Sequence, residues 1–519
     1  VTQLSSTFMA ARSSQHIVII GAGIGGLSAA ALLAQAGYRV TVLEAQTYPG
    51  GCASTFTHGG YRFDAGATVV GGFQEHGPHE LIGRQLGIEW PVRRYEPAWV
   101  THLPDRSIAL TADNADVLRV FPQSEAFWAH QSDIADLGWR LSSEGLPWPP
   151  TSLTEFLRLA RVGLAYFPKD LLLLPLAFRT TYQWIEQHEL AQDLSFVRFI
   201  DAQLLISSQT TSRFANAVYS GTALDLARQG VYHVAGGIGG LAETLVNKLR
   251  ELGGDVLYRQ RVTRIHVEQG RASGVSVKTG RRGKAEQFIP ADFVIGNLTP
   301  WSLDSLLGED SPAGLRREVM GRPLGWGAFA LHLGVDADKL PRDMADHQQI
   351  IRDVEGPMGE TRSLFLSVSP EWDTSRAPAG QRAVTVTTHT AVQPWWDLLA
   401  QDEGAYQARK AAYAEQMLEG IETAIPGFRQ AVRLMLPGSP VTYQFYTDRH
   451  LGQVGGFAQT SLFKARSPQT GLPNVRLVGD SIFPGQSTAG VTLGAMRVAA
   501  DVERTMPIRR TVSLAQSAG

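Results

Sequence analysis

The sequence predicts an α/β fold built on a parallel sheet, with an α+β unit inserted into it. Three observations predict this fold. An apolar strand runs directly into a glycine-rich turn near the N-terminus. A helix-forming segment and a second strand follow at once, and a further strand and helix of the same kind stand near the C-terminus. Because parts of the first unit lie at both ends of the chain, we expect that unit to be discontinuous.

Composition limits the possible function classes. The chain has 519 residues, 44% hydrophobic and 18% charged, which suits about two to four domains with an ample core. Its 47 Lys and Arg against 49 Asp and Glu give a net charge of −2, so the surface lacks the basic excess that nucleic-acid binding needs. Cys52 is the only cysteine, which excludes an intramolecular disulfide and an all-cysteine metal site. We expect no bound metal.

The first elements follow one another without a gap. Residues 16–20 form a short apolar run, rich in β-branched residues, that is typical of a buried parallel strand. The GxGxxG turn at 21–26 comes next, and the helix-forming segment 27–36 ends at Gly37. This order is typical of the Rossmann type of fold and makes the glycine pattern specific.

Each residue of the turn has a physical reason to be there. Gly21 allows the tight turn, Gly23 lets the backbone approach a pyrophosphate, and Gly26 lets helix and strand pack closely. Ile24 and Gly25 stand at the helix N-terminus, where free N–H groups and the positive end of the dipole attract phosphate. The turn therefore predicts a dinucleotide site.

An acidic residue completes the dinucleotide pattern. The second strand, at 38–43, ends on Glu44, with Ala45 after it. A carboxylate at this position accepts hydrogen bonds from the adenosine ribose hydroxyls and disfavours a 2′-phosphate, so NADP is not expected here.

Small residues further along favour FAD over NAD. Two segments of this kind can lie against a flat ring system: Gly50, Gly51, Cys52, Ala53 and Ser54, and then Gly66, Ala67 and Thr68. Near the C-terminus, a strand at 474–478 ends in Gly479 and Asp480, and an aspartate there can bind ribityl hydroxyls. The helix that begins around Gly490 and Val491 can direct its N-terminus at the flavin pyrimidine. We therefore predict FAD as the cofactor.

The middle of the chain returns to this domain. The glycine-rich loop at 236–240 is expected to lie against flavin or substrate, and strands are expected at 255–258, 261–267, 274–277 and 293–295. In FAD-binding folds of this kind the strand at Val262 contacts adenine through its backbone, and Asn297 follows the last strand. We expect these strands to join the N-terminal sheet. The predicted FAD-binding domain then comprises residues 15–90, 230–300 and 440–506, and the substrate domain 91–229 and 301–439.

Residues 156–179 form an apolar and aromatic segment flanked by Arg158, Arg161, Lys169 and Arg179. Two prolines interrupt it, and it is too short to cross a bilayer. It is either an interfacial patch that enters the lipid headgroup layer or a buried helix pair.

The expected cellular location of the protein follows from this apolar segment and from the composition of the N-terminal residues. Residues 1–14 lack an apolar core of signal-peptide length, and no run of 18 apolar residues occurs. We therefore expect a cytoplasmic protein with peripheral, monotopic contact at the inner face of a membrane. Residues 1–14 are predicted to be flexible and 507–519 to be a disordered tail.

The motifs at 21–26, 49–56 and 63–68 resemble the FAD-dependent phytoene desaturase superfamily, which includes carotenoid desaturases and isomerases and has an amine-oxidase-like fold. Within it, the segments 199–204 and 355–360 are most similar to the carotenoid 3,4-desaturase type. The resemblance extends over about 16–505. It implies that a C-3,4 (3′,4′) double bond is introduced into an acyclic or monocyclic, 1-hydroxylated carotenoid by hydride transfer to flavin, with a quinone or O2 as the electron acceptor.

One segment departs from that type. Ile482-Phe483-Pro484-Gly485-Gln486 stands where such desaturases carry Thr-His-Pro-Gly, and Phe-Pro-Gly-Gln is more similar to the carotenoid isomerases. A redox-neutral cis–trans isomerase is therefore the alternative. A non-catalytic isoprenoid binder is disfavoured, because such a protein need not keep Glu44, the glycine pair or Asp480.

No catalytic acid or base is identified from the sequence. His233 is either a proton acceptor or a hydrogen-bonded structural residue. His58, His76 and His79 do not have the spacing of a metal pair, so we interpret them as structural. Cys52 is interpreted as a small residue packed beside the cofactor. Three tryptophans, Trp326, Trp395 and Trp396, either line a polyene tunnel or belong to the core.

Overall fold

The computed structural model describes residues 14–280, 283 and 285–508, without the side chains of Asp170 and Leu172. The predicted flexible N-terminus at 1–14 and disordered tail at 507–519 lie outside the described residues, apart from 14, 507 and 508. Within the described part of the chain, no helix is both long and apolar enough to cross a bilayer.

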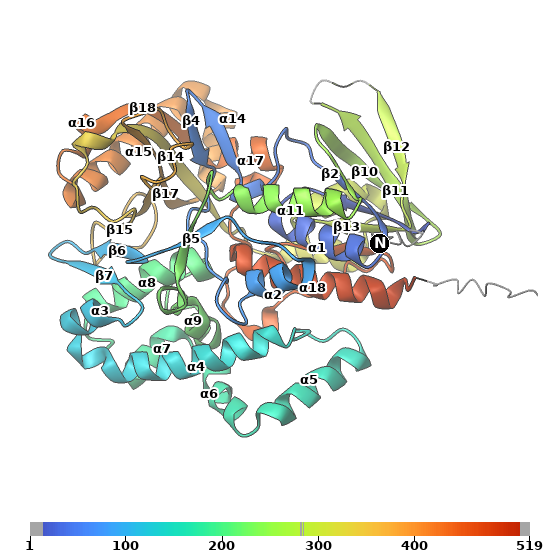
Figure 1. Cartoon of the computed structure of the whole chain (residues 1–519), viewed down its shortest axis with the longest axis horizontal. Helices are drawn as coiled ribbons and strands as arrows, with labels where there is room; N and C mark the ends of the chain where they lie inside the picture. Colours follow the sequence, from blue (N-terminus) through green and yellow to red (C-terminus); the bar gives the residue numbers. More distant parts are fainter. Residues whose placement is uncertain (1–13, 281–282, 284, 509–519) are drawn as a thin grey trace, which may run out of the picture.

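A five-stranded parallel sheet lies at the centre of one half of the molecule (Figure 1). In order across the sheet its strands are β19 (Val475–Leu477), β13 (Phe293–Gly296), β1 (His16–Ile20), β2 (Arg39–Leu43) and β9 (Asp255–Leu257). Every neighbouring pair is parallel. All five residues of β1 are buried, as expected for a strand covered on both faces. The helices α1 (Ile24–Gln35), α11 (Gly240–Glu251) and α18 (Ser487–Thr505) pack together beside the sheet.

Two of the strands expected to join this sheet do not. Strands β10 (Gln260–Glu268), β11 (Arg271–Thr279) and β12 (Glu286–Pro290) form a separate antiparallel sheet, so the prediction for 261–267 and 274–277 is wrong. The reason is the two-residue turn between β10 and β11. Gln269 has φ 50° and Gly270 φ 75°, and two successive positive φ values turn the chain back as a hairpin.

A seven-stranded sheet forms the core of the second half. In order across the sheet its strands are β18 (Val432–Gly438), β14 (Trp326–Asp336), β17 (Gln381–Ala391), β16 (Ser363–Val368), β15 (His347–Ile351), β6 (Trp99–His102) and β7 (Ser107–Leu110). Its pairs are antiparallel except β15 with β6. Residues alternate between the two faces of β14: Phe329, Leu331 and Leu333 belong to the core that includes Trp395, whereas His332 faces the interior of the molecule.

Helices complete the fold. The outer face of the seven-stranded sheet is covered by α14 (Gln393–Gln401), α15 (Glu403–Ala424) and α16 (Phe428–Ala431). A helical layer lies at the bottom of Figure 1 and comprises α3 (Ala115–Val120), α4 (Glu125–Ser143), α5 (Leu153–Tyr166), α6 (Leu173–Ala177), α7 (Thr181–Gln187), α8 (Leu194–Ser208) and α9 (Ala217–Ala223). The short helix α10 (Leu226–Gln229) follows α9 in the chain. The remaining α-helices and strands are α2 (Pro78–Leu86), α12 (Pro300–Leu307), α13 (Ala313–Gly321), α17 (Pro440–Thr447) and the pairs β3 (Thr55–His58) with β4 (Tyr61–Asp64) and β5 (Val92–Tyr95) with β8 (Val231–Val234).

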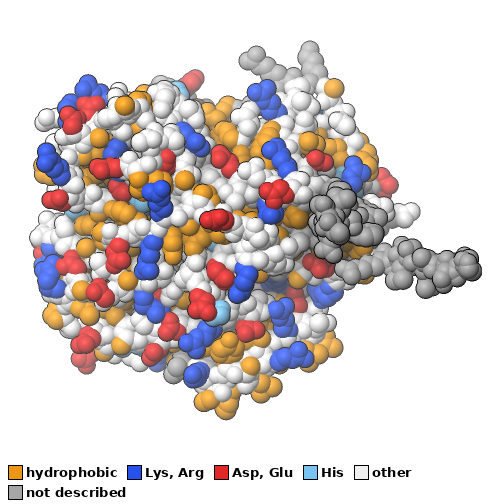
Figure 2. Space-filling view, in the orientation of Figure 1, with side chains coloured by type: hydrophobic (Ala, Val, Ile, Leu, Met, Phe, Trp, Pro, Cys, Tyr) orange, Lys and Arg blue, Asp and Glu red, His pale blue; other side chains and the backbone are white. Residues whose placement is uncertain are grey.

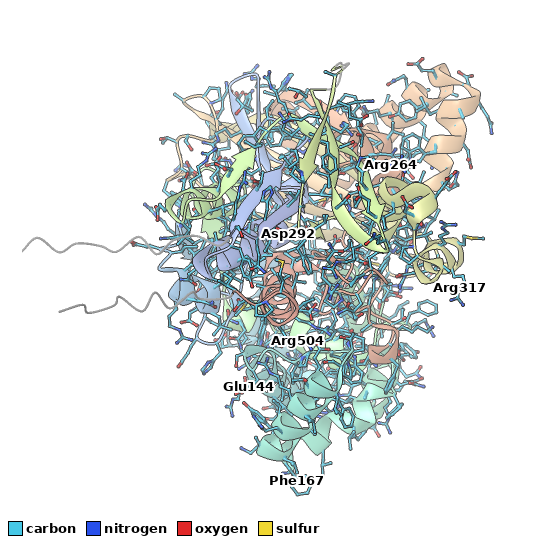
Figure 3. The ribbon with its side chains drawn as sticks, turned by 90° about the vertical axis from the view of Figure 1, so that its right-hand side faces the viewer. Glu144, Phe167, Arg264, Asp292, Arg317 and Arg504 are labelled. Atoms are coloured by element: carbon cyan, nitrogen blue, oxygen red, sulfur yellow. The ribbon has the colours of Figure 1, made fainter. Side chains whose placement is uncertain are left out.

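The apolar segment between Leu153 and Phe178 projects from this layer. Figure 3 places Phe167 at its outermost point, and Figure 2 shows hydrophobic side chains gathered at the same end. Val162 is the only buried residue of α5, while Leu164 is 79% and Phe178 74% exposed. The alternative of a buried helix pair is therefore wrong. We call the exposed set the apolar tip: Leu153, Phe156, Leu157, Leu164, Phe167, Leu171, Leu174 and Phe178.

Candidate active site

A cavity of about 1520 Å³ lies where the parallel sheet, the inner face of the seven-stranded sheet and the helical layer meet. Its lining includes residues of α1 and α18 on one side, of β14, β16 and β17 on another, and of α8 and α9 on a third. Sites for drug-sized ligands typically measure about 300–1,000 Å³, so this cavity has room for a large cofactor and a second ligand together.

Nearly all of the residues predicted to bind FAD line this cavity. They are Gly21, Gly23, Ile24, Gly25, Glu44, Ala45, Gly50, Gly51, Cys52, Ala53, Ser54, Gly66, Ala67, Thr68, Val262, Asn297, Gly479, Asp480, Gly490 and Val491. Gly26 is not among the lining residues. A Cβ at Gly26 would lie 2.5 Å from the carbonyl oxygen of Gly21, so this glycine permits the close packing of helix on strand.

The glycine turn fits a phosphate. Gly21 has φ 94° and its N–H donates to the Leu43 carbonyl at 2.8 Å, which fixes the turn at the end of the sheet. Gly23 caps α1 without any side-chain hydrogen bond, so no side chain competes for the first N–H groups of the helix. A Cβ on Gly23 would lie 2.4 Å from Nδ2 of Asn297, so a larger residue here would have to displace the Asn297 side chain.

Glu44 is held in one orientation by the backbone. The N–H of Ala22 donates to Oε2 and the N–H of Gln46 to Oε1, both at 2.8 Å. Burial raises the pKa of this carboxyl group, and those backbone hydrogen bonds oppose the shift. The carboxylate is thus fixed at the cavity wall beside the glycine turn, where it can accept hydrogen bonds from a ribose.

A second acidic group faces the cavity from the C-terminal part of the chain. Both oxygens of Asp480 pair with Arg449, at 3.1 Å to one guanidinium nitrogen and 3.0 Å to the other. No sequence motif surrounds Arg449, so the sequence does not predict this residue, and its pair with Asp480 forms only in the folded chain. Burial raises the pKa of the neighbouring Cys52 thiol, so Cys52 stays protonated and is a poor nucleophile.

The other half of the cavity is lined by larger side chains. These include Trp99, Trp139, Ile206, Tyr219, Leu226 and Phe365. Trp326, Trp395 and Trp396, considered as tunnel residues, are not among the lining residues. Trp395 is fully buried on the opposite face of the seven-stranded sheet, stacked on Phe329 at 5.4 Å between ring centroids. Alternation along β14 separates that face from the cavity.

The histidines have separate surroundings. His233 does not line the cavity, and its Nε2 lies 3.0 Å from Oδ2 of Asp346. His79 is buried, with Nε2 3.0 Å from the Thr488 hydroxyl, whereas His76 has a half-exposed side chain. His332 lines the cavity, and burial lowers its pKa to about 4, so it is neutral at physiological pH. Among the described residues, no group of three or more acidic, Cys or His side chains is arranged to hold a metal.

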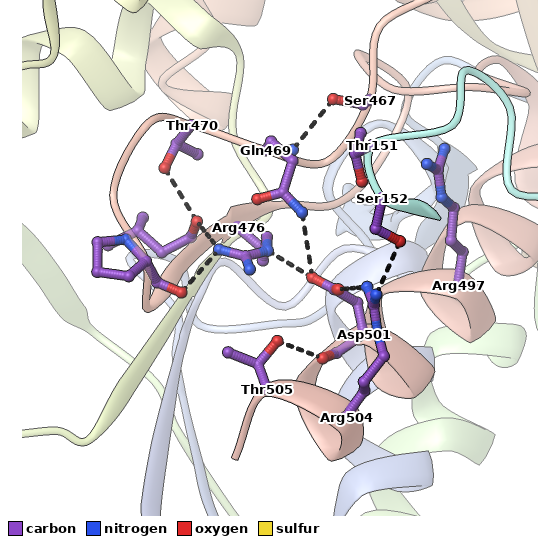
Figure 4. Close-up of polar contacts among 12 residues, drawn as sticks. Thr151, Ser152, Ser467, Gln469, Thr470, Arg476, Arg497, Asp501, Arg504 and Thr505 are labelled. Carbon is purple, nitrogen blue, oxygen red and sulfur yellow. Dashed lines mark hydrogen bonds and ion pairs between the residues drawn. The ribbon is translucent and has the colours of Figure 1, made fainter. Parts of the chain in front are cut away.

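A buried ion pair anchors α18, the helix whose N-terminus borders the cavity (Figure 4). Asp501 on α18 accepts from Nε of Arg476 on β19 at 2.5 Å. Arg504 also pairs with Asp501 and donates to the hydroxyl of Ser152, which caps α5. The network therefore joins the parallel sheet, the cavity helix and the base of the apolar tip.

Comparisons with known proteins agree with this architecture. The family model for flavin containing amine oxidoreductases matches residues 24–503. Prolycopene isomerase 2 of an Oncidium hybrid cultivar is 30% identical over 95% of this chain and 85% of its own length. The neurosporene-forming phytoene desaturase of Cereibacter sphaeroides is 25% identical over 96% of both chains. The crystal structure of an oxidoreductase from Methanosarcina mazei has a similar fold, with TM-score 0.63 and 18% identity over 94% of this chain and 100% of that one. The chain is an FAD-dependent oxidoreductase of the flavin containing amine oxidoreductase family, and within that family it belongs to the carotenoid desaturases and isomerases.

Proposed function

We propose that the protein is a carotenoid desaturase that forms the C-3,4 (3′,4′) double bond of an acyclic or monocyclic, 1-hydroxylated carotenoid. The observation that carries this proposal is the continuity of one cavity from the glycine turn to the side chains of α8, α9 and β16. A substrate in the second half would lie against a cofactor in the first.

The residues predicted to bind FAD would hold it in a definite order. The turn at 21–26 would bind the pyrophosphate, Glu44 the adenosine ribose, and Asp480 the ribityl chain. The segments 50–54 and 66–68 offer small side chains against the ring system. The N-terminus of α18 offers backbone N–H groups beside it.

Bound FAD supplies the acceptor for a hydride. The chain supplies orientation and a cavity in which large side chains replace water around the polyene. Desaturation removes a hydride from one carbon and a proton from its neighbour, and the electron pair left by the proton becomes the new double bond. A quinone or O2 would then accept the electrons.

A specific observation favours the isomerase as a second candidate. Phe483, Pro484, Gly485 and Gln486 stand between Asp480 and α18, and Pro484, Gly485 and Gln486 line the cavity. This Phe-Pro-Gly-Gln sequence is more similar to carotenoid isomerases. In addition, identity to relatives named prolycopene isomerase reaches 30%, against 25% for those named phytoene desaturase.

The apolar tip supports a peripheral membrane contact at the inner face of the membrane. Its exposed leucines and phenylalanines are too many for a surface that meets only water, and Arg158, Arg161 and Arg179 flank them. Phe178 stacks on the exposed Phe463 at 5.4 Å between centroids, which extends the apolar surface. A carotenoid dissolved in lipid would be taken up at this surface.

The test is anaerobic incubation of the FAD-loaded protein with a 1-hydroxylated acyclic carotenoid, following the flavin and polyene absorbance together. Flavin bleaching with a red shift of the polyene is the result expected for a desaturase. Isomer shifts that appear only after prior reduction of the flavin, with no extension of conjugation, would establish the isomerase instead. No change in either signal would contradict both candidates for this substrate.

A further inference from the structure

One hydroxyl group in the half of the cavity that is lined by larger side chains has no partner in the protein. It belongs to Tyr219 on α9, a partly buried residue that lines the cavity with Trp139 and Leu226. Burial raises the pKa of this hydroxyl, and neither a hydrogen bond nor a charge contributes to the shift. Among the described residues, no group pairs with the hydroxyl, and protein atoms do not seal it. It is therefore open to a ligand in the cavity.

Two other polar side chains in this part of the cavity lining are paired within the protein. The indole N–H of Trp139 donates to Oδ2 of Asp225 at 2.9 Å. The hydroxyl of Thr222 donates to the backbone carbonyl of Tyr219 at 3.1 Å. A polar group that is withdrawn from water without a partner costs free energy, so the Tyr219 hydroxyl calls for a partner that a ligand supplies.

Tyr219 lies beside the loop that leads into α18. Its ring is 6.1 Å from the ring of Phe483 in that loop, measured between centroids. The N–H of Asn216, the residue that caps α9, donates to the carbonyl of Gln459 at 2.9 Å. Nε2 of Gln459 in turn donates to the carbonyl of Pro484 at 3.0 Å. These contacts fix α9 against the loop, next to the helix N-terminus that is predicted to face the flavin.

This position suits the chemistry of the proposed substrate. At its hydroxylated end, a 1-hydroxylated carotenoid carries one alcohol group on an otherwise hydrocarbon chain. Only C-2 separates the carbon that carries this alcohol from C-3. When the C-3,4 bond lies at the flavin, the alcohol must therefore lie close to the flavin as well. The Tyr219 phenol stays protonated at physiological pH, because its pKa is raised, and can donate to an alcohol oxygen there.

We propose that Tyr219 determines specificity for hydroxylated carotenoids, by donating a hydrogen bond from its hydroxyl to the alcohol oxygen at C-1. This inference rests on the proposed function and names a residue that selects its substrate. A carotenoid without the alcohol would leave the Tyr219 hydroxyl against a hydrocarbon chain, and the lost hydration of that hydroxyl would oppose binding. A site built for a substrate alcohol in this way disfavours the analogue that lacks it.

The test measures binding without turnover. The ligands are a 1-hydroxylated carotenoid that already carries the 3,4 double bond and its 1-deoxy counterpart, so the oxidised, FAD-loaded protein cannot desaturate either at that bond. Quenching of tryptophan fluorescence gives both dissociation constants in detergent micelles. The proteins are the wild type, Tyr219→Phe and the matched control Tyr182→Phe. Tyr182 lies on α7 in the same helical layer and is not a lining residue of the cavity.

The expected result is a change in the ratio of the two dissociation constants. A neutral hydrogen bond typically changes a dissociation constant by about 2- to 10-fold. The wild type should bind the hydroxylated ligand more tightly, and Tyr219→Phe should reduce this preference by about 10-fold. Tyr182→Phe should keep the wild-type ratio, and comparing ratios between proteins cancels the different partition of the two ligands into micelles. The affinity for FAD should be the same in all three proteins, because the Tyr219 hydroxyl is assigned to the substrate.

This inference and the proposed function fail in different ways. If the ratio is the same in Tyr219→Phe and the wild type, the role of Tyr219 is wrong even where the wild type desaturates; a loss of FAD affinity instead would assign the hydroxyl to the cofactor. If the ratio falls in Tyr219→Phe but the wild type does not desaturate, the alcohol contact stands and the proposed reaction is wrong. If Tyr219→Phe does not fold, the wild-type ratio decides after correction for the measured micelle partition, and a ratio near one overturns the inference.

Discussion

Replacing Asp501 by asparagine should destabilise the protein strongly, because this charged residue of α18 is buried. The side chain of Asp501 is 4% exposed and that of its partner Arg476 is 5% exposed. The substitution keeps the shape and removes the negative charge, so the Arg476 guanidinium is left buried without a counter-ion. Arg504, on the next turn of α18, loses the same partner but is 41% exposed and can be solvated.

The expected magnitude follows from these contacts. Removing one partner of a buried ion pair typically costs about 3–5 kcal/mol. Arg476 keeps hydrogen bonds to the carbonyls of Leu472, Pro473 and Val475, between 3.0 and 3.2 Å. Those dipoles stabilise part of the unpaired charge, so we expect the lower end, about 3 kcal/mol. The surface pair with Arg504 adds little to this figure, because exposed pairs contribute about 0–1 kcal/mol.

The measurement is urea unfolding with saturating FAD, followed by far-ultraviolet circular dichroism. Glu503→Gln, at an exposed position of the same helix, is the matched control and should leave the unfolding free energy nearly unchanged. Replacing both partners, with Arg476→Met and Asp501→Leu together, should cost less than the two single changes summed, since no charge is left buried. A loss below about 1 kcal/mol for Asp501→Asn, or an equal loss for Glu503→Gln, would refute the reasoning.

Three further predictions follow from single features. His79 is buried with its pKa lowered to about 3 from 6.5, so the unfolded chain binds a proton that the folded chain does not. His79 alone should therefore lower the unfolding free energy by about 1.4 kcal/mol per unit as pH decreases from 6.5 toward 3, and His79→Gln should reduce the measured slope by that amount in pH-dependent urea titrations. Glu44→Gln should weaken FAD binding about tenfold in fluorescence titrations, because an acceptor with negative charge is lost; unchanged affinity would contradict its role. Leu164→Asp combined with Phe167→Asp should reduce flotation with liposomes, whereas Met320→Asp, at an 85% exposed position elsewhere, should float like the wild type.

The sequence determined the cofactor domain with little help from the rest of the fold. The turn at 21–26 needs glycine for local steric reasons. The strand before it and the helix after it can each be recognised from the hydrophobic pattern of a short segment. The family and FAD were likewise predictable from local patterns. The domain boundaries at 90, 230, 300 and 440 stay predictions, and so do the individual FAD contacts.

Only the tertiary structure decided which distant residues meet. Arg449 faces Asp480, which lies 31 residues further along the chain, and Thr68 contacts Ser367 across 299 residues of chain. The hydrophobic periodicity of the sequence does not predict such contacts, because strand pairing across a sheet depends on the packing of the whole domain. Only the tertiary structure shows that Trp395 is buried away from the cavity and that the residues of the apolar tip are exposed. A run of leucines and phenylalanines has the same pattern whether a core or a lipid surface covers it, and only the neighbouring elements distinguish the two.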